Sequence, residues 1–252
     1  MGVIPALRTD GLSLTFGALK AVSNVTFALA PGARHALIGP NGAGKTSFVN
    51  TLTGALSASA GGIFLGARNI TRLPQYERVK LGITRTFQIT TLFPGLTVLE
   101  SVMLAVCERK GRGNRLIRSV AEQKDEIAEA RQLLDLLRLG RDINVPTRHL
   151  PYGKQRLLEI ALALATRPKV LLLDEPAAGI PVGDSREMMG VIADLPREVS
   201  ILLIEHDMNL VFRFAEKITV MMSGEILTEG TPQQIQADAR VREVYLGEAA
   251  LG

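Results

Sequence analysis

The sequence has a single cysteine and no tryptophan, and only 4% of its 252 residues are aromatic. One cysteine excludes a framework of disulfide bonds and is typical of a protein from a reducing compartment. Because Cys107 stands in the apolar run SVMLAVC, we interpret it as a small buried side chain rather than a reactive thiol. The absence of tryptophan excludes no class of protein.

The chain also lacks a long apolar run. A helix that spans a membrane needs about 18 consecutive apolar residues or more. The most apolar stretch, IALALATRPKVLLLD, is interrupted by Arg167, Pro168 and Lys169, and we interpret it as a buried helix, a turn and a buried strand. The N-terminus has no charged start followed by an apolar core, so we expect no signal peptide. We expect a soluble protein that is able to dock on a membrane protein.

Neither sign of charge is in strong excess. The 29 basic and 25 acidic residues give a net charge of +4. The densest basic segment, residues 109–118, offers charges that phospholipid headgroups or nucleic acid can bind. Two glycines and the lack of aromatic residues favour a solvated linker there, and we expect no nucleic-acid partner.

The segment from residue 10 to residue 40 contains short runs typical of strands. Turns are expected at Gly17, at residues 23–24 and at residues 31–32. This pattern predicts antiparallel strands, followed by a buried strand in the run HALIG.

Two segments have the apolar spacing of helices with one buried face. In residues 44–54, the side chains expected to face inward are Phe48, Val49 and Leu52, and Gly54 is the expected stop. In residues 120–140, the corresponding side chains are Ile127, Ala130, Leu134 and Leu137, and Gly140 is the expected stop.

The whole chain is predicted to have an α/β fold. Residues 96–155 are predicted to be helical, and strands alternate with helices again in the runs VLLLDE, SILLIEHD and KITVMMSGEI. Strands that alternate with helices indicate a mostly parallel sheet, here interrupted by a helical insertion.

The run GPNGAGKT fits the pattern G-x-x-x-x-G-K-[ST] of a phosphate-binding loop, directly after a predicted strand and before a predicted helix. Its residues and the next one are Gly39, Pro40, Asn41, Gly42, Ala43, Gly44, Lys45, Thr46 and Ser47. Backbone N–H groups and the helix dipole would bind phosphate oxygens of ATP. Lys45 would reach the β- and γ-phosphates, and the Thr46 hydroxyl would ligate Mg²⁺. The alternative, a glycine-rich turn that binds nothing, does not account for this context.

Two carboxylates follow the apolar run VLLL. Ligands of α/β sheets gather at the carboxyl ends of the strands, so we expect Asp174 to hold Mg²⁺, directly or through water. Glu175 would then act as general base on the water that attacks the γ-phosphate.

Two further polar residues are expected near the γ-phosphate. His206 ends the strand run SILLIEH, where it can donate a hydrogen bond to the phosphate and orient the water. Gln88, in TRTFQ, could ligate Mg²⁺ or water before the helical insertion begins. We interpret His35 and His149 as structural.

The motifs GPNGAGKTS, RTFQ, LPYGKQRLLEIALALA, VLLLDEPAAG and LIEHD occur in this order. The set resembles the ATP-binding subunit of ABC transporters. The resemblance implies a P-loop NTPase (RecA-like) core with a small antiparallel β-subdomain in residues 1–95 and 156–252, and a helical signature subdomain in residues 96–155. It also implies that two such subunits enclose two ATP molecules, each phosphate loop facing the signature of the other subunit.

Several sequence segments are similar to those of branched-chain amino-acid importers of the LivG type, among them LFPGLTVLESV, DEPAAGI and GTPQQI near the C-terminus. Related importers take up other amino acids, amides, urea or aromatic acids. The implied partners are a second ATP-binding subunit (in a homodimer or a heterodimer), two transmembrane permease subunits and, indirectly, an external binding protein. The implied location is cytoplasmic, on the inner face of the membrane.

The resemblance also implies roles for single residues. Lys45, Thr46 and Ser47 would bind phosphates and Mg²⁺, Gln88 would be the Q-loop residue, Glu175 the catalytic base and His206 the switch histidine. Phe16 matches the aromatic residue that stacks on adenine, with Val22 nearby, although a phenylalanine in a strand can equally be a core residue.

The sequence departs from the family's pattern at two positions. Pro151 replaces the serine of the signature in LPYGKQ, and Pro181 stands where the D-loop usually has Asp or Asn. The lost hydroxyl should cost on the order of 1.5–3 kcal/mol of phosphate contact. The remaining candidates for contact with the partner's nucleotide are Tyr152, Gly153, Lys154 and Gln155. A proline is well tolerated at a helix start, so the following helix should form.

Two alternatives to a working transport ATPase remain. The chain could bind nucleotide with little catalysis at the site that its signature completes, as Pro151 and Pro181 suggest. It could also be an ABC ATPase outside transport, although such proteins usually carry long coiled-coil insertions or two ATPase halves.

Overall fold

The computed structural model describes residues 3–86, 92–111 and 124–243. The chain forms two compact units, which we describe separately. Unit one consists of Met1–Ile83, Lys169–Glu175 and Pro196–Gly252, and unit two of Thr84–Pro168 and Pro176–Leu195. Unit two is larger than the helical segment 96–155 expected from the sequence.

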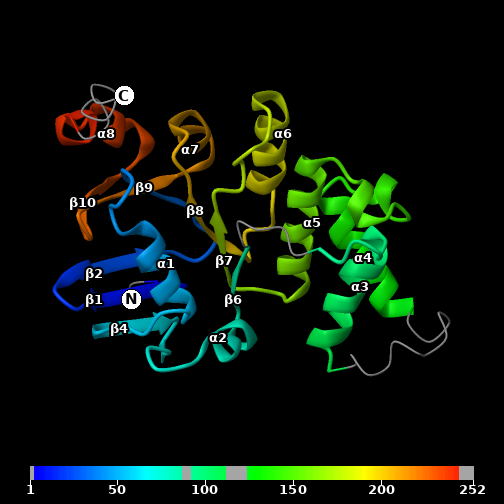
Figure 1. Ribbon diagram of the computed structural model, residues 1–252, viewed down its shortest axis with the longest axis horizontal. Coiled ribbons are helices and arrows are strands. Elements are labelled where there is room, and N and C mark those ends of the chain that lie inside the picture. The colour runs from blue at the N-terminus through cyan, green and yellow to red at the C-terminus, as the bar shows by residue number, and fades with distance from the viewer. Residues whose placement is uncertain (1–2, 87–91, 112–123, 244–252) are drawn as a thin grey trace. The chain divides into compact units, whose positions relative to one another are not determined.

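Unit one contains a mostly parallel sheet in the order β10-β9-β3-β8-β7, as predicted; β6, which begins at the unit's boundary, follows β7 in this order (Figure 1). The strands are β3 (Arg34–Ile38), β6 (Ile83–Arg85), β7 (Val170–Asp174), β8 (Ser200–Ile204), β9 (Lys217–Met222) and β10 (Glu225–Gly230). Strands β3, β7, β8 and β9 run parallel, and β10 pairs antiparallel with β9. Every residue of β3, β7 and β8 is buried, which explains the apolar runs LLL and ILLI of β7 and β8.

The second sheet of unit one is antiparallel, as predicted, in the order β2-β1-β4-β5. Its strands are β1 (Leu7–Phe16), β2 (Leu19–Leu29), β4 (Ala60–Leu65) and β5 (Arg68–Asn69). The turn predicted at Gly17 is present, but the one predicted at residues 23–24 is wrong. Asn24 has a φ of 50° inside β2 and donates its N–H to Ser13 Oγ at 2.9 Å. The strand therefore continues through a bulge, because β1 supplies a side-chain acceptor where the ladder is interrupted.

The helices of unit one are α1 (Lys45–Thr53), α2 (Gln75–Leu81), α7 (Met208–Phe214) and α8 (Pro232–Ala237). The three inward-facing residues predicted for α1 are fully buried, and Gly54 ends this helix with a φ of 83°. Both predictions for this segment are confirmed. None of the helices in residues 3–86, 92–111 and 124–243 is long and apolar enough to cross a membrane.

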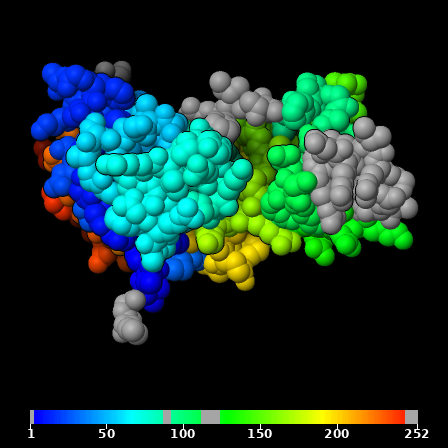
Figure 2. All heavy atoms as spheres, turned by 90° about the horizontal axis from the view of Figure 1, so that it is seen from below, coloured from blue at the N-terminus to red at the C-terminus, as the bar shows by residue number. Residues whose placement is uncertain are grey.

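A buried arginine holds the end of α1. The segment from β4 to α2 covers an outer face of unit one (Figure 2), yet Arg78 within it is only 2% exposed. Its guanidinium donates to the carbonyl oxygens of Thr51, Leu52, Thr71 and Leu73 at 2.7–2.9 Å. Because the last carbonyls of a helix have no partner within the helix, this one side chain satisfies two of them at the C-terminal end of α1, those of Thr51 and Leu52.

Unit two is helical, as predicted for most of it. Its elements are α3 (Val98–Arg109), the helix α4 (Lys124–Leu136), the 3-10 turns η3 (Gly140–Asp142) and η4 (Thr147–His149), α5 (Tyr152–Ala165) and α6 (Val182–Ala193). Thr97 and Glu100 form a reciprocal capping box at the start of α3. Cys107 is buried, as predicted.

The end of α4 differs from the prediction that Gly140 stops the helix. The helix ends at Leu136, and Arg138 takes the left-handed conformation with a φ of 58°. Leu139 donates its N–H to the Leu134 carbonyl at 2.7 Å, and both leucines are fully buried. The apolar contact therefore fixes the turn two residues early, and it does so without a glycine at the left-handed position.

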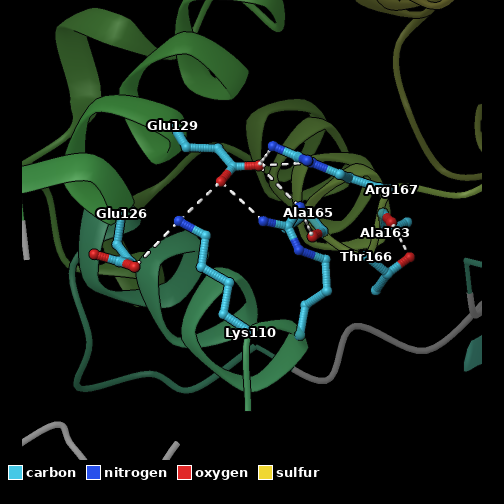
Figure 3. A network of polar contacts seen from close by, with 8 residues as sticks. Lys110, Glu126, Glu129, Ala163, Ala165, Thr166 and Arg167 are labelled. Carbon is cyan, nitrogen blue, oxygen red and sulfur yellow. Dashed lines mark hydrogen bonds and ion pairs between the residues drawn. The ribbon is translucent and has the colours of Figure 1, made fainter. Parts of the chain in front are cut away.

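Ionic contacts join three helices of unit two (Figure 3). Glu129 of α4 accepts hydrogen bonds from Arg109 of α3 at 2.8 Å and from Arg167, just after α5, at 3.0 Å. Lys110 reaches the buried Glu126 at 3.1 Å. The hydrogen bonds from Arg109 lower the pKa of Glu129 to about 2, with Arg167 adding to the effect against the opposing influence of burial. Glu129 is therefore ionised and links α3, α4 and the end of α5.

His35 lies in the core of unit one, as expected of a structural histidine. The ring is 1% exposed, with Nε2 2.8 Å from Thr219 Oγ1, and that hydroxyl donates to Glu229 at 2.6 Å. Burial lowers the pKa of His35 to about 4, although Glu229 opposes this shift; Lys217, which is paired with Glu229, adds to it. The ring is therefore neutral in the folded protein near neutral pH.

We expect the free energy of unfolding to fall by as much as about 3 kcal/mol as the pH is lowered from about 6.5 to about 4. In this window the unfolded chain protonates His35 while the folded chain does not, so acid favours unfolding. Urea denaturation at a series of pH values measures the slope. The variant His35→Gln should flatten it, and an unchanged slope in that variant would assign the acid sensitivity to other groups.

Candidate active site

The phosphate loop connects β3 to α1, and two of its glycines are required by close backbone contacts. Gly39 has a φ of 153°, and a Cβ there would lie 2.2 Å from the Met221 carbonyl oxygen. Gly44 has a φ of 98°, and a Cβ there would lie 2.4 Å from the Ala21 carbonyl oxygen. Any larger residue at either position would push the loop away from its neighbours.

A pocket of about 500 Å³ opens over this loop. It is lined by Leu19, Lys20, Ala21, Asn41, Gly42, Ala43, Gly44, Lys45, Thr46, Ser47, Glu175, Ile204, Ser223 and Gly224. The loop residues from Asn41 to Ser47 thus share one cavity with Glu175, the predicted base. All of these residues belong to unit one.

Lys45 lies against the loop itself. Its ammonium donates to the carbonyl oxygens of Gly39 and Pro40 at 2.6 and 3.0 Å. Thr46 and Ser47 follow in the first turn of α1, which has no acidic residue. This end of the helix therefore offers a positive dipole end, a cation and two hydroxyls to an anion in the pocket.

Asp174 and Glu175 stand at the end of β7. Asp174 is 5% exposed. Glu175 has a φ of 46° and donates its N–H to the Ile204 carbonyl at 2.9 Å, while its side chain is 32% exposed. A positive φ at a residue other than glycine costs about 1 kcal/mol or more. This conformation turns Glu175 out of the strand direction and is held by a bond to β8.

His206 lies beside Glu175. Its Nδ1 is 3.9 Å from Glu175 Oε1 and 3.6 Å from Glu205 Oε2, and the imidazole is 66% exposed. The two predicted residues are therefore brought together, and the structure adds a third, Glu205, that is 2% exposed. The sequence held one signal for it, an acidic residue that directly follows the apolar run SILLI.

The residues predicted to lie near adenine, Phe16 and Val22, are not among those that line the pocket. Val22 is fully buried in the core, so its side chain cannot line the pocket, whereas its neighbour Ala21 does. Successive side chains of a strand point to opposite faces, which makes this a shift of one residue. Phe16 is 49% exposed at the end of β1, but the described residues that line the pocket do not include it.

The turn between β9 and β10 was not predicted to belong to the site. Gly224 donates its N–H to the Ala43 carbonyl at 2.9 Å and accepts the Ser23 N–H at 2.8 Å. Ser223 and Gly224 also line the pocket. The turn therefore connects the phosphate loop to β2.

The signature segment starts α5 in unit two. Pro151 is the N-cap residue, with φ −55° and ψ 149°, so the prediction that the helix survives the proline is confirmed. Lys154 donates to both carboxylate oxygens of Asp142 at 2.8–2.9 Å, and Gln155 donates to the Leu150 carbonyl at 2.9 Å. The charge of Lys154 is thus compensated within the unit, which argues against its use on another subunit's phosphate.

Two other predicted positions remain. Pro181 is the N-cap residue of α6, with φ −55° and ψ 146°, and so it starts a helix as Pro151 does. Gln88 and residues 112–118 of the basic segment lie outside the described residues.

Comparisons with known proteins show which family this chain resembles. The family model described as ABC transporter matches residues 22–178, and one described as branched-chain amino acid ATP-binding cassette transporter matches residues 225–250. The high-affinity branched-chain amino acid transport ATP-binding protein LivG of Escherichia coli K12 is 39% identical, over 97% of this chain and 99% of its own. The corresponding protein BraF of Pseudomonas aeruginosa is 38% identical over the same shares.

The chain is also similar to solved structures. The ADP conformation of MJ1267, an ATP-binding cassette of an ABC transporter, has a TM-score of 0.82 at 29% identity, over 96% of this chain and 99% of its own. A nucleotide-free cassette from an ABC transporter has a TM-score of 0.81 at 28% identity, over 96% and 98%.

Proposed function

The chain belongs to the ABC transporter family and is an ATP hydrolase of that type, and we propose that it energises an importer of branched-chain amino acids or related small polar or aromatic acids. The observation that carries the catalytic part is the single pocket shared by the phosphate loop and Glu175. The transported class rests on the relatives' names and on the family match at residues 225–250.

Phosphates of ATP would bind over the loop. Lys45 would exchange its two carbonyl partners, Gly39 and Pro40, for β- and γ-phosphate oxygens, which form stronger, charge-assisted hydrogen bonds. Ala21 and Leu19 line the pocket beside the loop, and Phe16 remains a candidate for stacking on the base.

The donor set also fits Mg²⁺. The hydroxyl of Thr46 and the carboxylate of Asp174 are hard oxygen ligands, and Gln88 is a further candidate. When bound with ATP, the ion would neutralise charge on the phosphates. Asp174 is nearly buried, which suits a residue that meets a cation.

Hydrolysis would depend on Glu175 and His206. The carboxylate of Glu175 would accept the proton of the attacking water, and the imidazole of His206 would donate a hydrogen bond to the γ-phosphate. Their side chains are 3.9 Å apart at the nearest atoms, so both can address one phosphate.

The proposed transporter also contains other protein chains. We infer a second ATP-binding subunit, identical or related, two transmembrane permease subunits and an external binding protein, with this chain on the inner face of the membrane. In that arrangement the signature segment, including Tyr152 and Gly153, would complete the ATP site of the second subunit.

Reconstitution tests the function. The chain should co-purify with its two permease subunits, and vesicles that contain the complex should take up leucine in the presence of ATP and the loaded binding protein. A chain that hydrolyses ATP but never associates with permease subunits would favour an ATPase outside transport.

The variant Pro151→Ser should change the turnover of the assembled complex by less than about twofold. The N–H groups at the start of α5 carry the contact, and the helix already begins correctly with Pro151 as N-cap residue. Steady-state phosphate release measures this. A rise of about tenfold or more would mean that Pro151 weakens one composite site, which is the alternative suggested by the sequence.

A further inference from the structure

We propose that Glu205 is a positioning residue for hydrolysis, which holds the turn that carries His206. The inference deepens the proposed function and rests on it, because it assigns a role within the same site. No role for this buried carboxylate follows from the phosphate loop or from the two residues expected to act on the γ-phosphate.

The carboxylate of Glu205 lies inside the turn between β8 and α7. Its side chain is 1% exposed, and its Oε2 accepts the N–H of His206 at 2.9 Å and that of Asp207 at 3.4 Å. The same oxygen is 3.6 Å from Nδ1 of His206. One buried oxygen therefore faces both the backbone and the ring of the histidine.

The next residue of the turn is fixed as well. Asp207 accepts the N–H groups of Asn209 and Leu210 at 2.8 and 3.4 Å, as the N-cap residue of α7. The two carboxylates thus hold the chain on both sides of His206, whose ring itself is exposed. The backbone that carries the ring is thus fixed, while the exposed ring can still contact a ligand.

The end of β8 also positions the base. The carbonyl oxygen of Ile204, one residue before Glu205, accepts the N–H of Glu175. Ile204, the last residue of β8, and Glu205, the first residue after it, therefore hold the backbones of Glu175 and His206. Displacement of this strand end would move both groups relative to the γ-phosphate.

A carboxylate in this place is not explained by packing. Burial of an ionised carboxylate is unfavourable unless hydrogen bonds compensate it. An apolar residue that continued the run SILLI would have no such desolvation cost. Backbone N–H groups bonded to a carboxylate form charge-assisted bonds, which are about twice as strong as neutral ones. The unfavourable burial of this carboxylate is therefore offset by hydrogen bonds that fix the backbone of His206 and Asp207.

Two variants distinguish a positioning role of Glu205 from a general contribution to folding or nucleotide binding. Glu205→Leu removes the acceptor and keeps a similar volume, whereas Glu205→Gln keeps one oxygen acceptor. In the assembled transporter, Glu205→Leu should lower kcat on the order of tenfold with the KM for ATP unchanged, and Glu205→Gln should retain most of the wild-type kcat. Equal loss in both variants, or a loss confined to KM, would overturn the proposal.

A double-mutant cycle identifies the residue through which Glu205 acts. In the His206→Ala background, Glu205→Leu should cause little further loss, because the group that it positions is already absent. Two losses that multiply would show that Glu205 acts elsewhere. If Glu205→Leu does not fold, Glu205→Ala replaces it, since that side chain has no hydrogen-bond acceptor.

Amide hydrogen exchange gives a test that does not need turnover. In the purified chain, the His206 and Asp207 amides should exchange at least tenfold faster in Glu205→Leu than in wild type or in Glu205→Gln. Unchanged exchange would overturn the positioning role. Absence of ATP hydrolysis by the wild-type complex would instead count against the proposed function, so the two failures are distinguishable.

Discussion

Replacing Glu175 with glutamine should lower the rate of ATP hydrolysis at least a hundredfold while ATP remains bound. Glutamine has the same shape as glutamate but cannot accept the proton of the attacking water, and general-base catalysis contributes roughly 10²- to 10⁴-fold. The phosphate loop and Lys45 are unchanged, so nucleotide affinity should persist. Phosphate release by the assembled complex and retention of labelled ATP measure the two effects.

Glu198→Gln is a suitable control for this experiment. Glu198 is an exposed glutamate of the same unit, and its replacement makes the same change in net charge. It should leave hydrolysis within about twofold of wild type. Turnover of Glu175→Gln at the wild-type rate would refute the assignment of the base, and loss of ATP binding would assign Glu175 to nucleotide binding.

The variant Arg78→Met should lower the free energy of unfolding by about 3–5 kcal/mol. Burial lowers the pKa of the Arg78 guanidinium, which nevertheless donates to four carbonyl oxygens. Methionine fills part of the volume but removes all of these donors, and of the two oxygens at the end of α1 only that of Thr51 keeps another donor among the described residues, the Gly54 N–H. Urea denaturation with a constant m-value measures the loss.

The neighbouring Arg72 provides the matched control. It is exposed and belongs to the same segment, so Arg72→Met should change stability by less than about 0.5 kcal/mol. Arg78→Lys should fall between the two, since it keeps the charge but not the planar set of donors. Equal stability of Arg78→Met and Arg72→Met would show that water replaces the guanidinium.

Sequence reasoning succeeded where local chemistry decides the structure. The loop around Gly44 and the inward face of α1 follow from a glycine pattern and a helical period, and both were predicted. Val22, predicted to lie near adenine, is buried in the core, because the bulge in β2 and the alternation of its faces bring Ala21 rather than Val22 to the pocket. A pattern of residue types does not fix strand register at a bulge.

Other features depend on contacts between distant segments. Arg138 ends α4 because Leu139 is buried against Leu134, and an arginine carries no stop signal of its own. The position of Glu205 after the run SILLI is a weak signal, and its role follows only from its burial and its bonds to His206 and Asp207. Charged residues that act by positioning other residues are therefore the hardest to predict from a sequence.

The turn at Gly224 also bears on how the protein is made. Its bonds to Ala43 and Ser23 join the first and last parts of the sequence, and Ser223 and Gly224 form part of the pocket wall. A nascent chain that has already left the ribosome up to α7 still has an incomplete pocket. We therefore expect bound nucleotide to protect the full chain against unfolding more than it protects chains truncated before β9.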